Sequence, residues 1–247
     1  MSGPQRTPVR AALRMSWRAV ELSFAEDTIQ TRMARWAPHR LVVPYTRGML
    51  AALWLQPRPQ CIGIIGLGGG AQAKFCHRYL PWARVEAVEA DPQVLALRDV
   101  FRLPRDDARL EVSLDDGAAW ITQRPQRYDL LLLDAYDADG IPPALCTTAF
   151  YAACQAALRP GGVLVLNLFQ VATAEHLGTL RALFDGHMLV LPEPDLRNQI
   201  VFCWDGKRTP GSVADALRRL PWSAARQLWP SMQRLQAAWT ERAWRFS

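Results

Sequence analysis

The stretch of sequence that decides the fold is CIGIIGLGGGA, which occupies residues 61–71. Its first five residues are apolar and too few for a helix, which predicts a strand buried on both faces of a parallel sheet. Gly66, Gly68 and Gly70 then allow a sharp turn and let backbone N–H groups approach a ligand. A helix predicted over residues 71–80 points the positive end of its dipole at the same place. The stretch therefore predicts a strand, a ligand-binding glycine turn and a helix.

An acidic residue follows at the distance that a nucleotide site requires. A second apolar run predicts a strand over residues 84–88, and Glu89 stands at its end. A carboxylate in that position accepts hydrogen bonds from the two ribose hydroxyls of a nucleotide cofactor. Because Gly66-x-Gly68-x-x-Ala71 also fits the dinucleotide fingerprint, the glycines alone leave the kind of nucleotide open.

Length and composition indicate a globular chain. The 247 residues suit one large domain, with or without a small appendage, and half of them are hydrophobic, which excludes a disordered protein. Much of the net charge of +6 comes from arginines near the two ends. Such ends either touch nucleic acid or acidic lipid, or form solvated terminal segments, and we favour the second interpretation. We therefore expect no nucleic-acid partner.

The cysteines, histidines and apolar runs bear on cofactor class and location. The five cysteines and four histidines are scattered without a C-x-x-C pair or metal-ligand spacing. This predicts no metal, and cysteines that act as small core residues in a reducing cytoplasm. The first residues lack a long apolar core, and the chain has no run of about 18 apolar residues. These features predict a soluble, cytoplasmic protein without a membrane partner.

Strands and helices alternate through the middle of the chain, between two different ends. The alternation predicts an α/β domain over residues 46–206, with a mostly parallel sheet whose last two strands form an antiparallel pair. One of its helices is predicted over residues 91–101. Alternating apolar residues predict a β-hairpin over residues 17–33, within an N-terminal extension of residues 1–45. Residues 207–247 form a helical, tryptophan-rich extension, to which we assign no role.

Carboxylates stand at the ends of the predicted strands. Asp116 and Asp134 follow the third and fourth strands, and Asp137 lies in the loop after the fourth. Because the carboxyl ends of parallel strands open on one crevice, these residues should line it together with Glu89. Asp116 is explained nearly as well by a helix cap, and Asp137 and Asp139 by a polar loop. Asp134 differs, since an acid directly after a run of leucines is costly to bury without a function.

At these residues the chain resembles a known family. It resembles the spermidine synthases, aminopropyltransferases built on the class I S-adenosylmethionine-dependent methyltransferase fold. The resemblance extends over residues 28–204 and is clearest in residues 66–70, 88–91, 128–137 and 158–163. It implies a Rossmann-like class I methyltransferase fold. In that fold, a seven-stranded, mostly parallel sheet ends in an antiparallel last strand, and a small N-terminal β-hairpin is added.

The resemblance also implies roles for individual residues. Glu89 looks like the ribose-binding acid, Asp116 like the acid near the adenine amine, and Asp134 like the catalytic aspartate, which also borders the cofactor. Asp137 matches a second acid that serves catalysis and substrate binding, and Gln30 matches a cofactor-binding glutamine. Tyr45 and Tyr136 match substrate-binding tyrosines. The implied cosubstrate is decarboxylated S-adenosylmethionine or S-adenosylmethionine, without a metal. The implied acceptor is a small amine or another small nucleophile, and the implied assembly is a homodimer with contacts through the hairpin.

Two departures from the family pattern bear on the acceptor. The glycine loop of the family usually carries an aspartate where this chain has Gly69, and its Tyr-His-Glu reads Tyr45-Thr46-Arg47 here. The family uses the missing acids around the aminopropyl group and the polyamine. A cationic Arg47 in their place should repel a diamine, which argues against putrescine.

Three hypotheses follow for the function. The first is transfer of an aminopropyl group from decarboxylated S-adenosylmethionine to an altered amine acceptor, and we favour it. In the second, Gly69 and Arg47 leave room for the carboxylate of intact S-adenosylmethionine, and the protein is a methyltransferase or another transferase. The third is a noncatalytic cofactor-binding or regulatory homologue, against which Asp134 and Asp137 argue together. A dehydrogenase ranks last, because the chain offers one glycine turn and no evident substrate domain.

Overall fold

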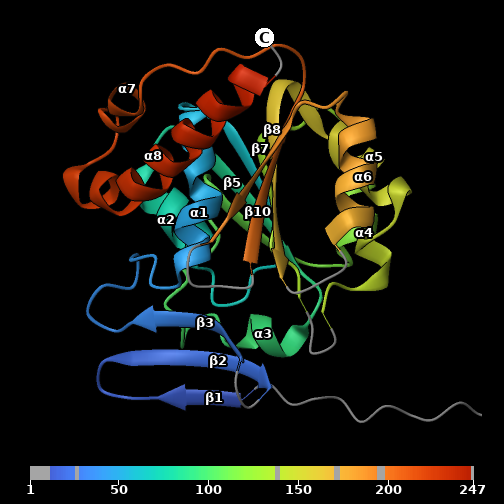
Figure 1. Ribbon diagram of the computed structural model, residues 1–247. Coiled ribbons are helices and arrows are strands. Elements are labelled where there is room, and N and C mark those ends of the chain that lie inside the picture. Colours follow the sequence, from blue (N-terminus) through green and yellow to red (C-terminus); the bar gives the residue numbers. More distant parts are fainter. Residues whose placement is uncertain (1–11, 26–27, 137–139, 170–172, 194–197, 246–247) are drawn as a thin grey trace, which may run out of the picture.

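The structure, a computed structural model, describes residues 12–25, 28–136, 140–169, 173–193 and 198–245. Its main feature is a large sheet with helices on both faces, and a small sheet lies below it in Figure 1. The large sheet has seven strands in the order β6-β5-β4-β7-β8-β10-β9. These strands are β4 (Cys61–Ile65), β5 (Arg84–Glu89), β6 (Leu110–Leu114), β7 (Tyr128–Leu133), β8 (Leu158–Phe169), β9 (Met188–Pro192) and β10 (Asn198–Trp204).

Strand direction in the large sheet matches the prediction. β4 pairs in parallel with β5 and β7, β5 pairs with β6, and β7 pairs with β8. β10 is antiparallel to both of its neighbours, β8 and β9. The predicted seven-stranded, mostly parallel sheet with an antiparallel strand near its end is therefore confirmed. The carboxyl ends of its parallel strands meet at one edge, where α/β proteins bind their ligands.

Helices cover both faces of the large sheet because the side chains of each strand alternate. Ile62 and Ile64 of β4 point into one core, and Cys61 and Ile65 point into the other. The first core is closed by α1 (Pro44–Leu50), the 3-10 helix η1 (Ala51–Trp54), α2 (Ala71–Tyr79), α7 (Val213–Leu217) and α8 (Trp222–Arg245). The second is closed by α4 (Gly117–Thr122), the 3-10 helix η2 (Pro143–Leu145), α5 (Thr148–Ala156) and α6 (Thr173–Leu183).

The small sheet contains one strand more than predicted. Its strands β1 (Ala12–Met15), β2 (Ala19–Ala25) and β3 (Thr28–Ala34) are antiparallel and adjacent in that order. The β2–β3 hairpin is the predicted one. β1 escaped prediction because all four of its residues are exposed, so it is held by backbone pairing to β2 and leaves no hydrophobic pattern.

The small sheet also presents exposed hydrophobic side chains. Met15, Trp17 and Trp36 are 59%, 67% and 84% exposed. The homodimer expected through the hairpin stays a prediction.

A short helix, α3 (Pro92–Ala96), connects the two sheets. Val20, Leu22 and Met33 of the small sheet pack against Val94 and Phe101. The helix predicted over residues 91–101 is therefore too long. Beyond Ala96 the N–H groups of Leu97 and Arg98 donate to carbonyls three residues back, those of Val94 and Leu95, at 3.1 Å each, so the chain continues in turns. Lys74 Nζ donates to the Phe101 carbonyl at 2.7 Å.

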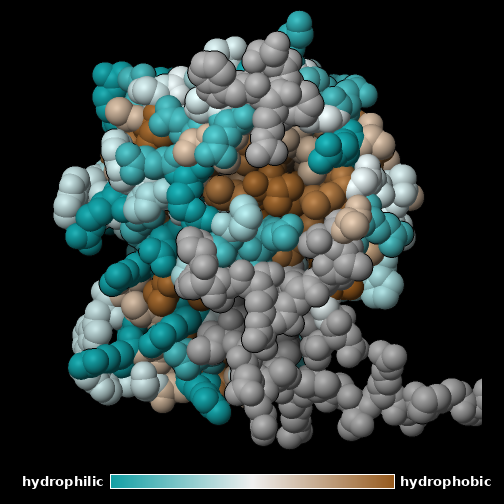
Figure 2. Space-filling model, in the orientation of Figure 1, coloured by the Kyte–Doolittle hydropathy of each residue, from teal (hydrophilic) through white to brown (hydrophobic). Residues whose placement is uncertain are grey.

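The C-terminal helix α8 is an integral cover of the large sheet. The Trp239 ring lies 5.9 Å from the Trp54 ring and 4.7 Å from the Trp204 ring, measured between centroids. Figure 2 shows a hydrophobic area at the surface beside this helix, over β8 and β10, and smaller hydrophobic areas elsewhere on this face. Among the described residues, no helix combines the length and the apolar character needed to cross a membrane.

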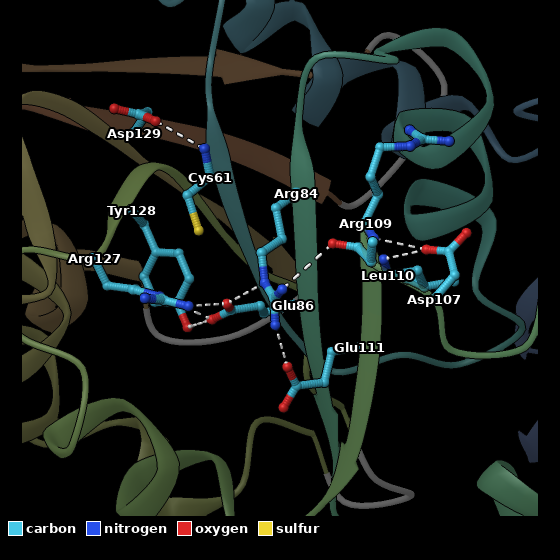
Figure 3. A network of polar contacts seen from close by, with 11 residues as sticks. Cys61, Arg84, Glu86, Asp107, Arg109, Leu110, Glu111, Arg127, Tyr128 and Asp129 are labelled. Atoms are coloured by element: carbon cyan, nitrogen blue, oxygen red, sulfur yellow. Dashed lines mark hydrogen bonds and ion pairs between the residues drawn. The ribbon is translucent and has the colours of Figure 1, made fainter.

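Glu86 of β5 is the buried centre of a polar network near the amino ends of the strands (Figure 3). Its carboxylate accepts hydrogen bonds from Arg84 Nε at 2.9 Å, from the Tyr128 hydroxyl at 3.0 Å and from Arg127. Burial acts to raise the pKa of Glu86, but the bonds from the arginines and Tyr128 hold that pKa below its usual value. Because Arg84 also pairs with Glu111 at 2.5 Å, the network joins β5, β6 and the start of β7.

We expect the Glu86→Gln variant to be less stable by about 2 kcal/mol, because one uncharged amide replaces a buried acceptor of three donors. Glu111→Gln is the matched control. Glu111 is 47% exposed at its side chain, and we expect its substitution to cost less than about 0.5 kcal/mol. The stabilisation by Glu86 is present above its unfolded pKa and is lost as the pH falls through its lowered folded pKa. Thermal unfolding at neutral and acidic pH checks this, and equal losses in both variants would contradict it.

Candidate active site

The glycine loop lies directly against the end of β7. Gly66 has a φ of +89°, and a Cβ placed on it would lie 2.4 Å from the Asp134 carbonyl oxygen. Only glycine fits here, because both the space and the left-handed backbone exclude a side chain. Gly70, with a φ of +66°, then forms the N-cap of α2. The predicted strand, glycine turn and helix are thus all present at the carboxyl edge of the sheet.

Glu89 faces this loop, as its position at the end of β5 predicts. Its Oε2 accepts hydrogen bonds from the backbone N–H groups of Leu67 at 3.0 Å and Gly68 at 3.3 Å, and its Oε1 from that of Asp91 at 3.0 Å. A carboxylate offers about four acceptor directions, so it retains room for a ribose hydroxyl. The ribose-binding role stays a prediction, and the structure adds a second role, which is to hold the loop.

Every hydrogen-bond donor to the Asp134 carboxylate among the described residues is neutral. Gln72 Nε2 donates to Oδ2 at 3.0 Å, Asn167 Nδ2 donates to Oδ1 at 2.9 Å, and Tyr45 also forms a hydrogen bond with the carboxylate. Burial raises the pKa of Asp134 to about 7, against the lowering effect of these three bonds. Burial and the adjacent Asp134 charge raise the pKa of Tyr45 as well, so Tyr45 stays a neutral donor. A carboxylate with such a pKa is suited to accept and release a proton near neutrality.

Two buried asparagines extend this arrangement into a chain. Asn198 Nδ2 donates to Asn167 Oδ1 at 2.7 Å, and Asn167 Nδ2 donates in turn to Asp134. The bond from Asn198 fixes the orientation of the Asn167 amide, because its oxygen must face Asn198 and its nitrogen must face Asp134. Gln72, Asn167 and Asn198 were not predicted as site residues. A polar residue inside the apolar run of β8 was the available signal for Asn167.

The structure places two of the remaining predicted site residues, Tyr136 and Asp116. Tyr136 donates its hydroxyl to the Asn167 backbone carbonyl and therefore lies beside the Asp134 cluster. Asp116 caps α4, with Oδ1 accepting from the Ala119 N–H at 2.8 Å, so the helix-cap alternative is confirmed, and adenine contact stays a prediction. Asp137 and the side chain of Gln30 lie outside the described residues.

Comparison with known proteins identifies the family. The sequence model of the spermine/spermidine synthase domain matches residues 48–177. A polyamine aminopropyltransferase from Neisseria meningitidis is 34% identical over 187 residues, which cover 74% of this chain and 71% of the relative. The chain belongs to the spermine/spermidine synthase family.

Solved structures confirm the predicted class I methyltransferase-like fold. A probable spermidine synthase from Corynebacterium glutamicum has a TM-score of 0.70 and 18% identity, over 85% of this chain and 82% of its own. Human methyltransferase-like protein 13, solved in complex with SAH, has a TM-score of 0.64 and 25% identity, over 77% of this chain and 93% of its own. The likeness thus extends to family members and to methyltransferases.

The first departure from the family pattern is built into the packing. The Gly69 N–H donates to Thr31 Oγ1 at 3.1 Å, and a Cβ on Gly69 would lie 2.2 Å from Thr31 Cγ2 and 2.7 Å from Phe101 Cδ1. Thr31 and Phe101 therefore fill the space in which an acidic side chain would start. The small sheet contributes to the site through this contact.

The second departure, Arg47, leaves a cation on α1 close in sequence to Tyr45. Arg47 Nη2 donates to the Val42 carbonyl at 3.4 Å. Its Nε is buried and has no partner among the described residues.

Over the same residues, no three His, Cys, Asp or Glu side chains gather as metal ligands.

The Asn198→Leu variant should move the pH dependence of turnover. Leucine removes the donor that orients Asn167, so Asp134 loses a bond that lowers its pKa, and the acidic limb near pH 7 should shift upward by up to about one unit. Gln199→Leu is the control, since neighbouring side chains of a strand point to opposite faces. The measurement is the pH profile of kcat/KM for all three proteins. A lower rate with an unmoved limb would show that Asn198 has only a structural role.

Proposed function

We propose that this protein transfers the aminopropyl group of decarboxylated S-adenosylmethionine to a small amine. The observation that carries the proposal is the Asp134 carboxylate, which lies beside the glycine loop with its pKa raised by burial to about 7. Membership of the spermine/spermidine synthase family and the 34% identical polyamine aminopropyltransferase support the same activity.

Asp134, with a pKa of about 7, can act as the base in aminopropyl transfer. A free alkylamine is protonated at neutral pH, so Asp134 first accepts a proton from the ammonium group. The amine nitrogen then attacks the carbon beside the sulfonium, and a C–N bond forms as the C–S bond breaks. The bonding pair returns to sulfur, which leaves as the neutral thioether of methylthioadenosine, and the product nitrogen carries the positive charge. Asn167 and Tyr45 would keep the carboxylate in position during this step.

The cosubstrate would bind along the glycine loop. Gly66, Gly68 and Gly70 allow close approach of its adenosyl part to the backbone, and Glu89 retains an acceptor direction for ribose. Decarboxylated S-adenosylmethionine has no carboxylate to be repelled by Asp134, which favours it over the intact cofactor.

Methyl transfer from S-adenosylmethionine is the second candidate. It is favoured by the unpartnered Arg47 Nε, which would suit the carboxylate of the intact cofactor, and by the absence of room for an acid at Gly69. The 25% identity to human methyltransferase-like protein 13 points the same way.

Calorimetric titration with decarboxylated S-adenosylmethionine, S-adenosylmethionine and methylthioadenosine distinguishes these candidates. We expect the decarboxylated form to bind at least about tenfold more tightly than the intact form, which corresponds to about 1.4 kcal/mol. Preference for the intact cofactor would replace aminopropyl transfer by methyl transfer. Absence of binding by all three would contradict both candidates and leave a noncatalytic regulatory protein.

The Asp134→Asn variant should lose turnover by about 10²–10⁴-fold, because an amide cannot accept the proton. Cofactor affinity should remain within about threefold, since the loop and Glu89 are unchanged. Product formation and calorimetry on the same preparation check both expectations. Full activity in this variant would remove Asp134 from the mechanism.

The same variant should be more stable than the wild type at neutral pH. A raised folded pKa means that Asp134 destabilises the native state as the pH rises from about 4, its ordinary pKa, through about 7, its folded pKa. The advantage of Asp134→Asn should therefore grow over this range and stay constant above it. Thermal unfolding at several pH values measures it, and a pH-independent difference would contradict the raised pKa.

A further inference from the structure

The C-terminal helix α8 binds the segment that leads into α1. Gln227 Oε1 accepts a hydrogen bond from the Leu41 N–H at 2.9 Å, although the two residues are 186 positions apart in the sequence. Leu41 is buried and stands just before α1. α8 also packs on α1 itself, beside which it lies in Figure 1. The helix therefore holds the element that carries Tyr45, a hydrogen-bond partner of Asp134.

A buried ion pair joins the same helix to the residue after β9. Arg234 Nη1 lies 3.3 Å from Glu193 Oε1, and Arg234 also donates to the Pro192 carbonyl. The Glu193 side chain is 2% exposed. A Cβ on Gly48 of α1 would lie 2.5 Å from Glu193 Oε1, so the carboxylate lies directly against the backbone of α1. Glu193 is thus enclosed between α1 and α8.

Glu193 is also connected to the asparagines of the site. Its N–H donates to the Asn198 carbonyl at 3.0 Å. The Asn198 side chain donates to Asn167, which donates in turn to Asp134. Two routes therefore lead from α8 to the Asp134 carboxylate. One passes through α1 and Tyr45, and the other passes through Glu193 and the two asparagines.

Positioning explains this ion pair better than stability does. Burying two charges costs about as much as their attraction returns, so an apolar pair of similar size would stabilise the fold equally well. An arginine, in contrast, donates in fixed directions. Arg234 uses two of them at once, on the Glu193 carboxylate and on the Pro192 carbonyl, and so fixes the chain at the end of β9.

We propose that α8 is a positioning element of the active site and that Arg234 is its main positioning residue. By holding Glu193 against α1 and β10, Arg234 keeps Tyr45 and Asn198 where they orient the Asp134 carboxylate. A displacement of about 1 Å at a reacting group lowers a rate by about 10²-fold, so a distant contact of this kind affects turnover. The proposal rests on the proposed function, in which Asp134 is the base. It gives a role to a helix outside the residues that the family model matches.

The first experiment compares two arginines of the same helix. Arg234→Met takes the guanidinium away from Glu193. Arg226→Met removes the same charge elsewhere, since Arg226 is exposed and lies 4.6 Å from the centroid of the Trp222 ring. With n-butylamine as the acceptor, we expect kcat to fall by about tenfold or more in Arg234→Met and by less than about twofold in Arg226→Met. The KM for decarboxylated S-adenosylmethionine should stay within about threefold in both variants, because the cosubstrate binds along the glycine loop.

A double variant separates positioning from loss of stability. Arg234→Met alone withdraws the guanidinium from a buried carboxylate and should lower the melting temperature. Adding Glu193→Met replaces both charges by apolar side chains, so the melting temperature should return towards that of the wild type. The kcat should stay low, because nothing then binds the Pro192 carbonyl. Recovery of kcat together with the melting temperature would overturn the proposal, and so would a wild-type kcat in Arg234→Met.

Asp134 can also be followed without turnover. Its carboxylate is bound by Tyr45 of α1, Gln72 of α2 and Asn167 of β8, all of them neutral. Loosening the bonds from Tyr45 and Asn167 removes contacts that lower its pKa. The pH range over which Asp134→Asn gains stability should therefore extend to higher pH in the Arg234→Met background than in the wild type.

Thermal unfolding of the four proteins, with and without each substitution, measures this range. The same range in both backgrounds would overturn the proposal, whether or not the wild type transfers an aminopropyl group. A range that moves in a protein without aminopropyl transfer would support the positioning by α8 and overturn only the proposed function.

Discussion

The candidate active site depends on one close approach between two backbone segments. A Cβ on Gly66 would lie 2.4 Å from the Asp134 carbonyl oxygen, and the Asp134 N–H donates to the Ile65 carbonyl at 2.9 Å. The glycine loop and the end of β7 are therefore packed without an intervening side chain. This contact brings the base within reach of Gln72, which stands just beyond the loop. A change in the conformation of the glycine loop would therefore also move Asp134, the base.

The architecture was predictable because burial leaves a mark on the sequence. β4 and β7 read as nearly continuous apolar runs, as strands covered on both faces do, and the glycines mark the turn between strand and helix. The two misjudged elements have a different cause. β1 is held by backbone pairing, and after α3 the N–H groups of Leu97 and Arg98 bind carbonyls three residues back, so the helix gives way to turns. Hydrophobic periodicity records neither a strand held only by its backbone nor this change of backbone hydrogen bonding.

The same distinction divides the site. Glu89 and Asp134 could be predicted, since acids at the carboxyl ends of parallel strands share one edge. Gln72 and Asn198 could not, because an amide after a glycine loop or at the start of a strand has no distinctive pattern. Gln72 matters because it donates to Asp134, and Asn198 matters because it donates to Asn167. Asn167 is intermediate, for a polar residue in the apolar run of β8 stands out even without a structure.

The contact between Thr31 and the glycine loop has a consequence for the history of the site. Thr31 Cγ2 and Phe101 Cδ1 lie where a side chain on Gly69 would begin, at 2.2 Å and 2.7 Å from its Cβ. Positions 31, 69 and 101 are therefore epistatic, although they belong to three separate segments. An acid at position 69 becomes compatible with the fold only after its neighbours shrink or move, so the order of substitutions decides which intermediates are viable. The small sheet, which looks peripheral, thereby restricts the evolutionary routes open to the loop that it touches.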